Sequence, residues 1–408
     1  MTKIRLLLFI LTIIVVGSVG VVVAMFARGY RFNSNTLKFS PNGLLVLKSV
    51  PDGAQILIDG ELKTATNVTV PVPPGTYDIS IKKEGYSSWN KRLVIDKEVV
   101  TEATAYLFKS VPSLSAVTFT GVINPTPSKD MTKIAYVVAP VLQESNSQDE
   151  NSGLWVMDTI NLPLGFSRQP RRITDGDLTI ASWMWSPDGR NILLASKTGN
   201  YLLDTGTFTP QGKRINIGIA QKEETLTSWI EKDQKKLDAQ MKKLPEELQS
   251  ILKHKASAIV FAPDENMLVY TASGSATVAN DLIPQLPGSS TQKQERNLKD
   301  GSTYVYDIKE DRNFIIDDGA YGKLTIDNGY TSDTTRRLAW FPTSRHLVLA
   351  ESGKVTILDY DGTNRQVVYS GSYIAPHAYP TLSSDRLLVL TNLGADSNPP
   401  NLYSLSLD

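Results

Sequence analysis

A proline-containing β-hairpin returns several times along the chain, and this repetition constrains the fold more than any other feature. Each clear copy has an aromatic residue two positions before a proline, then a turn and an apolar strand. The copies are Trp185-Ser186-Pro187, Phe261-Ala262-Pro263 and Trp340-Phe341-Pro342. Alternating apolar residues on both sides of the turn are typical of two short antiparallel strands. A hairpin that recurs in this way predicts an array of similar units.

Apolar strands that end in aspartate accompany these hairpins. The aspartates are Asp158, Asp204, Asp307, Asp359 and Asp408. In the two copies without insertions, Pro187 to Asp204 and Pro342 to Asp359, the two signatures are 17 positions apart. Weaker copies begin at Pro127 and Pro380, and another short strand follows most of the aspartates. The predicted unit is four short antiparallel strands, repeated about five times from residue 117 onward.

Four-stranded units in series are typical of a β-propeller. One such sheet cannot bury both faces alone, so neighbouring sheets must stack around a ring, with the aromatic residues between them. The predicted fold class is all-β, with a propeller of about five blades over residues 112–408 and six blades as the alternative. The repeats resemble TolB-like and WD-repeat-like propellers, whose blades often carry a Ser-Pro-Asp-Gly turn such as residues 186–189.

The sequence also predicts how the ring closes. The last unit has no segment after Asp408 for a fourth strand, whereas residues 113–121 are strand-like and precede the first unit. We expect these two parts of the chain to pair, because pairing removes an exposed edge strand.

The amino terminus predicts a membrane segment. No residue from Leu6 to Ala27 is charged, and a helix of about 22 residues is roughly 33 Å long, enough to cross a bilayer core of about 30 Å. A secretory signal has a shorter apolar region and a cleavage site flanked by small residues, which Met25 does not provide. We predict an uncleaved signal anchor at 6–27 after a cytoplasmic tail at 1–5; a cleaved signal is the alternative. Basic residues on both sides leave the orientation open.

A polar linker at 28–43 precedes a predicted small all-β domain at 44–109. Leu45 and Leu47, then Ile56 and Ile58, alternate with their neighbours as in strands. Asp59-Gly60 predicts a tight hairpin, and Pro74-Gly75 predicts a type II turn.

Four ordered motifs in this segment resemble the signature of the PEGA domain. They are Val50-Pro51-Asp52-Gly53-Ala54, Ile58-Asp59-Gly60, Pro73-Pro74-Gly75-Thr76-Tyr77 and Lys83-Glu84-Gly85-Tyr86, with Asp52 where the family usually has Glu. Similar domains occur in prokaryotic envelope and surface proteins and are mostly non-catalytic. The resemblance therefore implies a β-sandwich outside the cytoplasm.

Two insertions interrupt the propeller pattern. Residues 222–255 predict a helical hairpin, with a capping box at Ser228 and Glu231 and a second helix from Pro245. Its apolar stripes are Leu226, Ile230, Leu237, Met241 and Leu244 on the first helix and Leu248, Ile251 and Leu252 on the second. We expect the hairpin to cover one face of the propeller, with docking of a partner as the alternative. Residues 274–300 predict a polar loop insertion.

Composition argues against several kinds of site. Lys plus Arg and Asp plus Glu both number 42, so the chain lacks the basic field expected for nucleic-acid binding. No cysteine is present, which excludes disulfides and thiol nucleophiles. The histidines, His254, His346 and His377, are far apart in sequence, and residues 359–364 begin like a calcium loop but lack its later Gly and Glu. Residues 317–319, Asp-Asp-Gly, predict a turn between blades.

These features predict a non-catalytic, membrane-anchored binding or scaffold protein. We expect the amino terminus in the cytoplasm and the bulk of the chain on the extracytoplasmic side of a prokaryotic envelope, with an envelope protein or a cell-wall polymer as partner. No catalytic, cofactor-binding or metal-binding residue is predicted, no cofactor is expected, and no ligand-binding residue can be named. A propeller-based hydrolase or lyase using carboxylates from separate blades, and a TolB-like sensory or transport accessory, are the alternatives.

Overall fold

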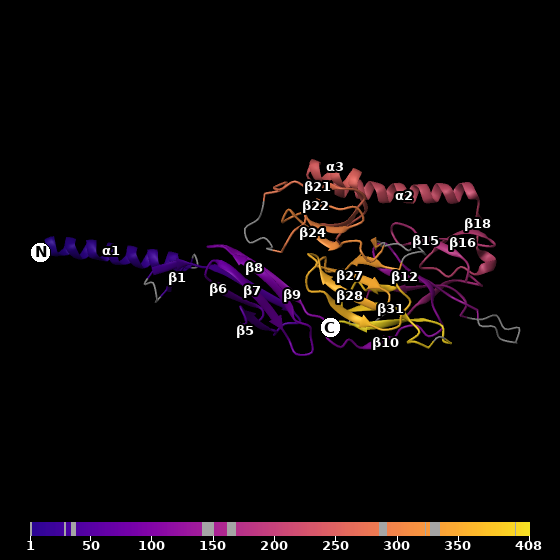
Figure 1. Ribbon diagram of the computed structural model, residues 1–408, viewed down its shortest axis with the longest axis horizontal. Helices are drawn as coiled ribbons and strands as arrows, with labels where there is room; N and C mark the ends of the chain where they lie inside the picture. Colours follow the sequence, from indigo (N-terminus) through magenta and orange to yellow (C-terminus); the bar gives the residue numbers. More distant parts are fainter. Residues whose placement is uncertain are drawn as a thin grey trace. The chain divides into compact units, whose positions relative to one another are not determined.

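The computed structural model divides into two compact units, the first containing Met1–Phe108 and the second formed by Lys109–Pro284 and Lys293–Asp408. Figure 1 shows the chain coloured along its sequence. The structure describes residues 2–27, 30–33, 38–140, 151–160, 169–284, 292–322, 324–326, 335–395 and 397–408.

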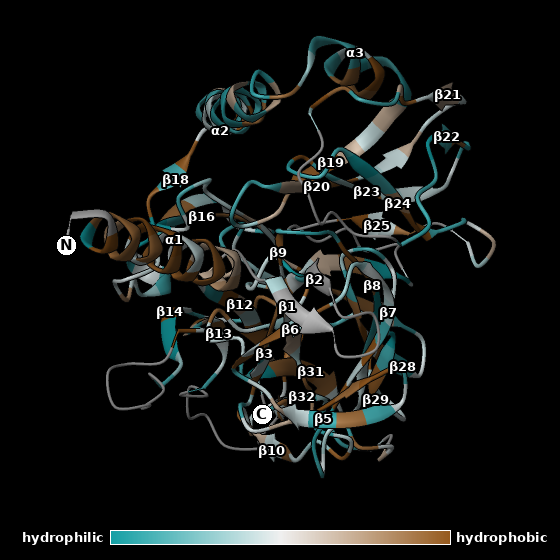
Figure 2. Ribbon diagram, turned by 90° about the vertical axis from the view of Figure 1, so that its left-hand side faces the viewer, coloured by the Kyte–Doolittle hydropathy of each residue, from teal (hydrophilic) through white to brown (hydrophobic). Residues whose placement is uncertain are grey.

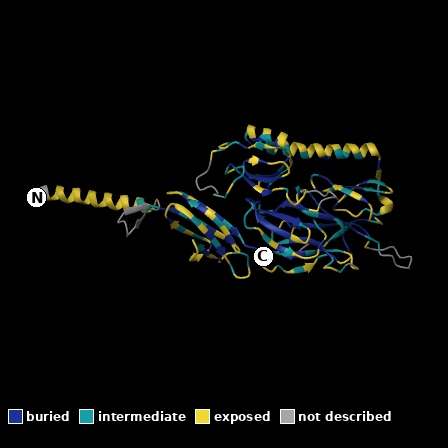
Figure 3. Cartoon of the chain, viewed as in Figure 1, coloured by how far each residue is buried: buried dark blue, intermediate teal, exposed yellow. Residues whose placement is uncertain are grey.

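The first unit begins with helix α1 (Thr2–Ala27), of which Ile4–Ala27 is long and apolar enough to cross a membrane. Its side chains are hydrophobic (Figure 2) and exposed along the helix (Figure 3). The segment after it differs from the predicted irregular linker, because β1 (Tyr30–Asn33) and β2 (Lys38–Pro41) pair as antiparallel strands. Pairing satisfies the backbone hydrogen-bonding groups of both segments. The sequence did not predict these strands, because four residues are too few to show a strand periodicity.

Two sheets form the rest of the first unit. One has the order β6-β3-β9, from Val68–Val72, Gly43–Val50 and Val100–Tyr106; the other has the order β5-β4-β7-β8, from Glu61–Ala65, Gln55–Ile58, Gly75–Lys82 and Trp89–Ile95. Their inner faces share one apolar core that includes the predicted Leu45, Leu47, Ile56 and Ile58. The expected β-sandwich is confirmed.

The turns of this sandwich divide into one correct and one incorrect prediction. Asp59 and Gly60 both have positive φ, 50° and 83°, as a tight hairpin between β4 and β5 requires. The predicted type II turn at Pro74-Gly75 is wrong. Gly75 begins β7 and pairs with Ile95 in the ladder, so its backbone is extended instead of left-handed.

The second unit contains five sheets of four or five strands in the described part of the chain. Sheet 1 has β11 (Ile123–Pro127), β12 (Lys133–Val138), β13 (Gly153–Asp158) and β14 (Arg171–Asp175). Sheet 2 has β15 (Ser182–Trp185), β16 (Asn191–Ser196), β17 (Gly199–Asp204) and β18 (Asn216–Ile217). Sheet 3 has β19 (Ala256–Phe261), β20 (Met267–Ala272), β23 (Thr303–Asp307) and β24 (Arg312–Asp317).

The last two sheets each include a strand that the repeat pattern does not contain. Sheet 4 has β25 (Thr325–Ile326), β26 (Arg337–Trp340), β27 (His346–Glu351), β28 (Lys354–Asp359) and β29 (Gln366–Ser370), and β25 is parallel to β26. Sheet 5 has β30 (Ala378–Pro380), β31 (Arg386–Thr391) and β32 (Asn401–Ser406), with β10 (Leu114–Ala116) as its fourth strand.

Strand register shows that the five sheets are copies of one unit. In each repeat unit the first strand is β11, β15, β19, β26 or β30, and its last residue pairs with a residue seven positions later. The pairs are Pro127 with Ile134, Trp185 with Ile192, Phe261 with Leu268, Trp340 with Leu347 and Pro380 with Leu387. In the two weak copies, proline therefore occupies the position of the aromatic residue. The Asp408 assignment is wrong, because Ser406 pairs with Arg386 where the other copies have the aspartate.

The predicted role of the aromatic residues between sheets is confirmed for both tryptophans. Trp185 lies in the core shared by sheets 1 and 2, and its indole Nε1 donates to the Thr126 carbonyl at 3.0 Å. Trp340 lies in the core shared by sheets 3 and 4 and donates to the Val260 carbonyl at 3.1 Å. Each indole thus fastens its sheet to the first strand of the preceding one, as expected for blades of a β-propeller.

The predicted closure is also confirmed. Leu114 pairs with Leu405 in the ladder between β10 and β32, and the amide of Val117 donates to the Leu402 carbonyl at 2.9 Å. A core cluster joins sheet 5 to sheet 1. The strand from before the first sheet therefore completes the last sheet and removes an exposed edge.

A buried polar chain links the first strands of three sheets. The Tyr379 hydroxyl donates to the Pro125 carbonyl at 2.6 Å and lies 2.5 Å from His377 Nδ1. Because a carbonyl only accepts, the hydroxyl hydrogen is used there, and His377 Nδ1 must be the donor to the Tyr379 oxygen. Arg337 lies over the Tyr379 ring at 4.8 Å and donates to the Ala378 carbonyl at 3.2 Å. Sheets 1, 4 and 5 are thereby connected.

Helices replace direct sheet packing between sheets 2 and 3. The face of sheet 2 that points away from sheet 1 contributes Leu193, which packs on Trp229 of helix α2 (Ile219–Met241). On the same face Met184 is 52% exposed, whereas its counterpart in sheet 4, Ala339, is 3% exposed. On the other side of the joint, helix α3 (Glu246–Lys255) packs on a face of sheet 3 through its residues Leu248 and Leu252.

Helix α2 is also tied to the turns of two sheets. Asp233 forms an ion pair with Lys129 in the turn between β11 and β12. Lys243, just after the helix, forms an ion pair of 2.6 Å with Glu265 in the turn between β19 and β20. Figure 1 shows α2 and α3 along one side of the second unit. The hairpin thus has its apolar side toward sheets 2 and 3, as expected, but it lies at the joint between them and not as the expected cover over one face of the propeller.

Several details of the predicted helical hairpin need correction. The first helix begins at Ile219, with Gly218 as its N-cap, so Ser228 and Glu231 lie inside it and form no capping box. Ile230 is 65% exposed and Trp229 takes its place on the buried side. The helix-forming residues before Ser228 extend the helix by further turns, and this extension overrides the local capping signal. The second stripe is confirmed, with Leu248 and Leu252 fully buried.

Described residues of the insertion at 274–300 pack on sheet 3. β21 (Ala276–Thr277) pairs with β22 (Asn297–Leu298) within the insertion. A separate 3₁₀ helix, outside the insertion, is formed by Gln211–Lys213. Buried Arg296 and Asp311 form an ion pair of 3.2 Å that holds the insertion against the turn before β24. Residues 285–291 of this predicted loop lie outside the described residues.

Replacing Trp229 tests whether α2 is held as a separate layer. Trp229→Ala should remove about 3 kcal/mol of packing between α2 and sheet 2. We expect faster amide hydrogen exchange in α2, measured by mass spectrometry on the full chain, with unchanged protection of β16 and β20. Ile230→Ala, at the neighbouring exposed position, serves as the control. Unchanged exchange in α2, or equal loss of protection in all sheets, would contradict a separately held helix.

His377 predicts a pH dependence of stability. Burial, followed by the charge of Arg337, lowers the pKa of His377 to about 4 from 6.5. Protonation then favours the unfolded chain, so this contribution is complete above pH 6.5 and is lost as the pH falls toward 4. The loss amounts to about 3 kcal/mol.

The pH measurement must compare variants, because another group acts oppositely. Burial raises the pKa of Asp307 to about 6, so its protonation stabilises the fold in an overlapping range. Urea unfolding of wild type and His377→Gln at pH 7 and pH 4 separates the two effects. We expect the wild-type advantage over the variant to be larger at pH 7, and an advantage independent of pH would refute this account.

Candidate ligand-binding pocket

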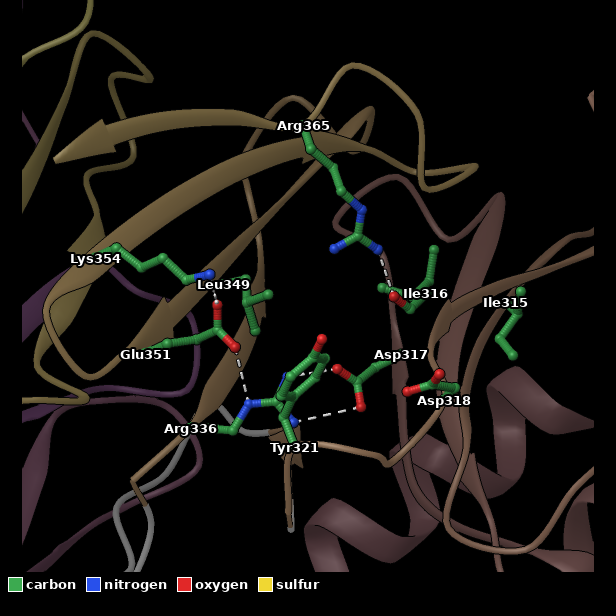
Figure 4. A pocket seen from close by; sticks show the side chains of 10 residues that line it. All are labelled: Ile315, Ile316, Asp317, Asp318, Tyr321, Arg336, Leu349, Glu351, Lys354 and Arg365. Carbon is green, nitrogen blue, oxygen red and sulfur yellow. Dashed lines mark hydrogen bonds and ion pairs between the residues drawn. The ribbon is translucent and has the colours of Figure 1, made fainter. Parts of the chain in front are cut away.

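A pocket of about 520 Å³ lies between sheets 3 and 4 (Figure 4). This volume falls within the range of about 300–1,000 Å³ that is usual for small-ligand sites. Strand β24 and the turn after it supply Ile315, Ile316, Asp317, Asp318 and Tyr321, and sheet 4 supplies Arg336, Leu349, Glu351, Lys354 and Arg365. The site therefore depends on the two sheets packing at the correct distance.

Arg336 is the centre of the pocket. It precedes β26 and its side chain is 7% exposed. Its guanidinium donates to Asp317 of sheet 3 at 2.5 Å and, through Nε, to Glu351 of sheet 4 at 2.9 Å. A further bond of 3.1 Å reaches the Gly322 carbonyl. One buried cation thus connects two carboxylates that come from different sheets (Figure 4).

The electrostatics of the pocket are balanced internally. Burial by itself would lower the pKa of Arg336, but hydrogen bonds and charge from Asp317 and Glu351 outweigh burial and raise it. Lys354 lies 3.2 Å from the second oxygen of Glu351. The lining contains three cationic side chains, Arg336, Lys354 and Arg365, and three carboxylates, Asp317, Asp318 and Glu351. The pocket therefore presents no large excess of either charge.

The turn after β24 explains how Asp317 is positioned. Its Oδ1 accepts the amide hydrogen of Gly319 at 2.9 Å, as in an Asx turn. Gly319 has a φ of 79°, and a Cβ there would lie 3.0 Å from the Gly301 carbonyl oxygen. Both the left-handed conformation and the close approach favour glycine. The turn predicted at residues 317–319 is present, and it also forms a wall of the pocket.

Three side chains form the outer part of the pocket. Tyr321 is 80% exposed, and its ring lies 5.8 Å from the Arg336 guanidinium. Asp318 is exposed and accepts the amide hydrogen of Ala320 at 3.0 Å. Arg365 donates to the Ile316 carbonyl at 2.5 Å and to the Gly362 carbonyl at 3.2 Å. The pocket thus has buried ion pairs at its bottom and an aromatic ring and polar groups at its rim.

The residues considered in the sequence analysis do not assemble into this pocket, apart from Asp317 and Asp318. His254 is at the end of α3, His346 begins β27 and lies 3.3 Å from Asp359, and His377 belongs to the buried chain described above. In residues 359–364, the Asn364 side chain donates to Asp359 at 2.9 Å within a turn. No group of three His, Asp or Glu side chains suited to a metal ion occurs in the described ranges.

Sequence reasoning missed Arg336, Glu351 and Tyr321. A usable signal was present, because Arg336-Arg337 directly precedes an apolar strand and Glu351 ends the next one. When two neighbouring strands are apolar on both faces, charged residues at their ends indicate that these residues have ion-pair partners at the edge of the sheet. Tyr321 carries no such signal.

The network predicts unequal effects of two arginine substitutions. Arg336→Ala leaves two carboxylates without their shared cation and should lower the free energy of unfolding by about 3–5 kcal/mol. Arg365→Ala removes an exposed side chain and should cost about 1 kcal/mol or less. Urea titration of the full chain in detergent, followed by tryptophan fluorescence, measures both. Equal costs for the two variants would show that the Arg336 network does not stabilise the interface.

Comparisons with known proteins found similar structures and one matching domain family. Structures similar to the chain include a TolB protein from Agrobacterium tumefaciens, at 12% identity over 70% of this chain and 73% of that one, with a TM-score of 0.21. Another is TolB from Acinetobacter baumannii, at 12% identity and a TM-score of 0.22, where the match covers 81% of this chain and 60% of that chain. Because these scores are low, the propeller assignment depends on the sheets themselves. No curated protein matches the sequence. Residues 42–110 match the PEGA domain family, and the first unit therefore contains a PEGA domain.

Proposed function

We propose that this chain is a membrane-anchored binding or scaffold protein of the prokaryotic cell envelope, with its PEGA domain and propeller on the extracytoplasmic side. One observation carries the proposal: a helix of membrane-spanning length ends at Ala27, and a PEGA domain begins at residue 42. We place the residues after Ala27 together on one side of the membrane, because α1 is the one helix in the described ranges that is long and apolar enough to cross it. PEGA-like domains occur in envelope proteins, which supports the outer side.

The pocket supports binding in preference to catalysis. It does bring together carboxylates from separate sheets, Asp317 and Glu351, which the hydrolase or lyase alternative requires. Arg336 donates to both of them, at 2.5 and 2.9 Å. A general acid or base must exchange a proton with the substrate, and both carboxylates are already engaged as acceptors of a buried cation. We therefore assign these groups to holding the pocket in shape.

The absence of native cysteine allows a direct test of orientation. Thr207→Cys places one thiol in an exposed turn after β17, and Thr2→Cys places one at the start of α1. We expect a membrane-impermeant maleimide to label the Thr207→Cys variant in intact spheroplasts. The Thr2→Cys variant should react only after the membrane is permeabilised.

The opposite labelling pattern would overturn the proposal, because a propeller in the cytoplasm cannot bind envelope ligands. Labelling of both variants in intact spheroplasts would also overturn it. The cysteine-free wild type provides the background signal. The TolB-like sensory or transport alternative predicts the same labelling but requires a defined envelope complex, which crosslinking in cells would detect.

A further inference from the structure

We propose that the pocket between sheets 3 and 4 binds a short stretch of a neutral glycan, with one sugar ring stacked on Tyr321. This inference rests on the proposed function and names the ligand class for the same site. It follows from the charge balance of the pocket, from its exposed aromatic ring and from the polar groups around that ring.

Charge balance favours an uncharged ligand. Two of the three cations and two of the three carboxylates pair with one another, through Asp317–Arg336, Arg336–Glu351 and Lys354–Glu351. The remaining cation and carboxylate, Arg365 and Asp318, are equal in number and opposite in charge. A polyanion would have to compete with the carboxylates, and a polycation with the guanidinium groups and the ammonium. A neutral polyol meets neither penalty and can use both donors and acceptors.

Tyr321 provides a flat surface for a sugar ring. The ring lies over the guanidinium of Arg336, which is itself held by two carboxylates. Because Tyr321 is 80% exposed, most of its ring remains open to a ligand. A pyranose has one face of C–H groups that packs on an aromatic ring and hydroxyls at its edge. The aromatic ring buries apolar area, and its phenol oxygen remains in water.

The groups beside Tyr321 have hydrogen-bonding capacity for those hydroxyls. Within the described part of the chain, Asp318 uses one carboxylate oxygen and Arg365 uses Nε and Nη2. The second oxygen of Asp318 and Nη1 of Arg365 have no partner among those residues, and Lys354 has further N–H donors beyond its bond to Glu351. Acceptors and donors therefore surround the ring.

The geometry disfavours an extended peptide at this place. A peptide would add to the outer edge of β24, but the Ile316 carbonyl on that edge already accepts from Arg365. Gly362 also lies against this edge, since a Cβ on it would come within 3.1 Å of the Ile315 carbonyl oxygen. The turn after β28 thus covers the positions that strand addition requires.

Binding is measured by isothermal titration calorimetry on the full chain in lipid nanodiscs, which avoids detergents with sugar head groups. The probes are two neutral tetrasaccharides, one of N-acetylglucosamine and one of glucose, and a polyanionic heparin tetrasaccharide. We expect at least one neutral probe to saturate the protein and the heparin probe to bind more weakly or not at all. Tyr321→Ala should weaken binding about tenfold or more, whereas Tyr321→Phe keeps the ring and should retain it.

Phe119→Ala is the matched control, because Phe119 is 79% exposed and lies outside the pocket. Urea titration checks that the variants remain folded. The inference is overturned if neither neutral probe binds, if only heparin binds, or if Tyr321→Ala binds as the wild type does. Extracytoplasmic labelling without glycan binding would overturn this inference alone, and cytoplasmic labelling would overturn the proposed function itself.

Discussion

Each propeller sheet of this protein is apolar on both faces, and every other feature of the second unit depends on covering both of them. A four-stranded sheet with one open face would expose a row of Leu, Ile and Val side chains to water, at about 25 cal/mol for each Å². Shared apolar cores cover the faces between sheets 1 and 2, sheets 3 and 4, and sheets 5 and 1. The indole groups of Trp185 and Trp340 set the distance at the first two of these joints by bonding to the preceding first strand. The ends of the chain meet in sheet 5 for the same reason.

The joint between sheets 2 and 3 shows that a blade face can be covered by helices. The copy at this joint has Phe261 where two others have tryptophan, and phenylalanine has no N–H to donate across the joint. α2 and α3 occupy the position instead, with Trp229 on one sheet and Leu248 on the other. The cover is incomplete, since Met184 and Leu202 stay 52% and 45% exposed. This joint therefore has less packing on sheet 2 than the others have.

The ligand pocket is a consequence of the same packing at another joint. Apolar residues of sheets 3 and 4 fill the inside of their interface, and the ionic network of Arg336 closes its edge. Such a buried network is sensitive to the distance between the two sheets, because each carboxylate comes from one of them. Packing of the two sheets and the shape of the pocket are thus coupled. A rigid ion-pair network of this kind, lying beneath an exposed ring such as Tyr321, can hold the ring in one orientation for a ligand.

Local pattern alone determined the repeat unit, the apolar helix, the PEGA motifs and the existence of the helical hairpin, because each is encoded in one continuous segment of the chain. It also predicted the closing strand, since an unpaired edge has only a few possible partners. Tertiary structure decided the register of the weak copies, where Pro127 and Pro380 take the aromatic position, and the replacement of sheet packing by helices. It alone brought Asp317, Arg336 and Glu351 together. Arg336 and Glu351 are neighbours in the hairpin of β26 and β27, but Asp317 comes from sheet 3, and only the stacking of complete blades places it within hydrogen-bonding distance of Arg336.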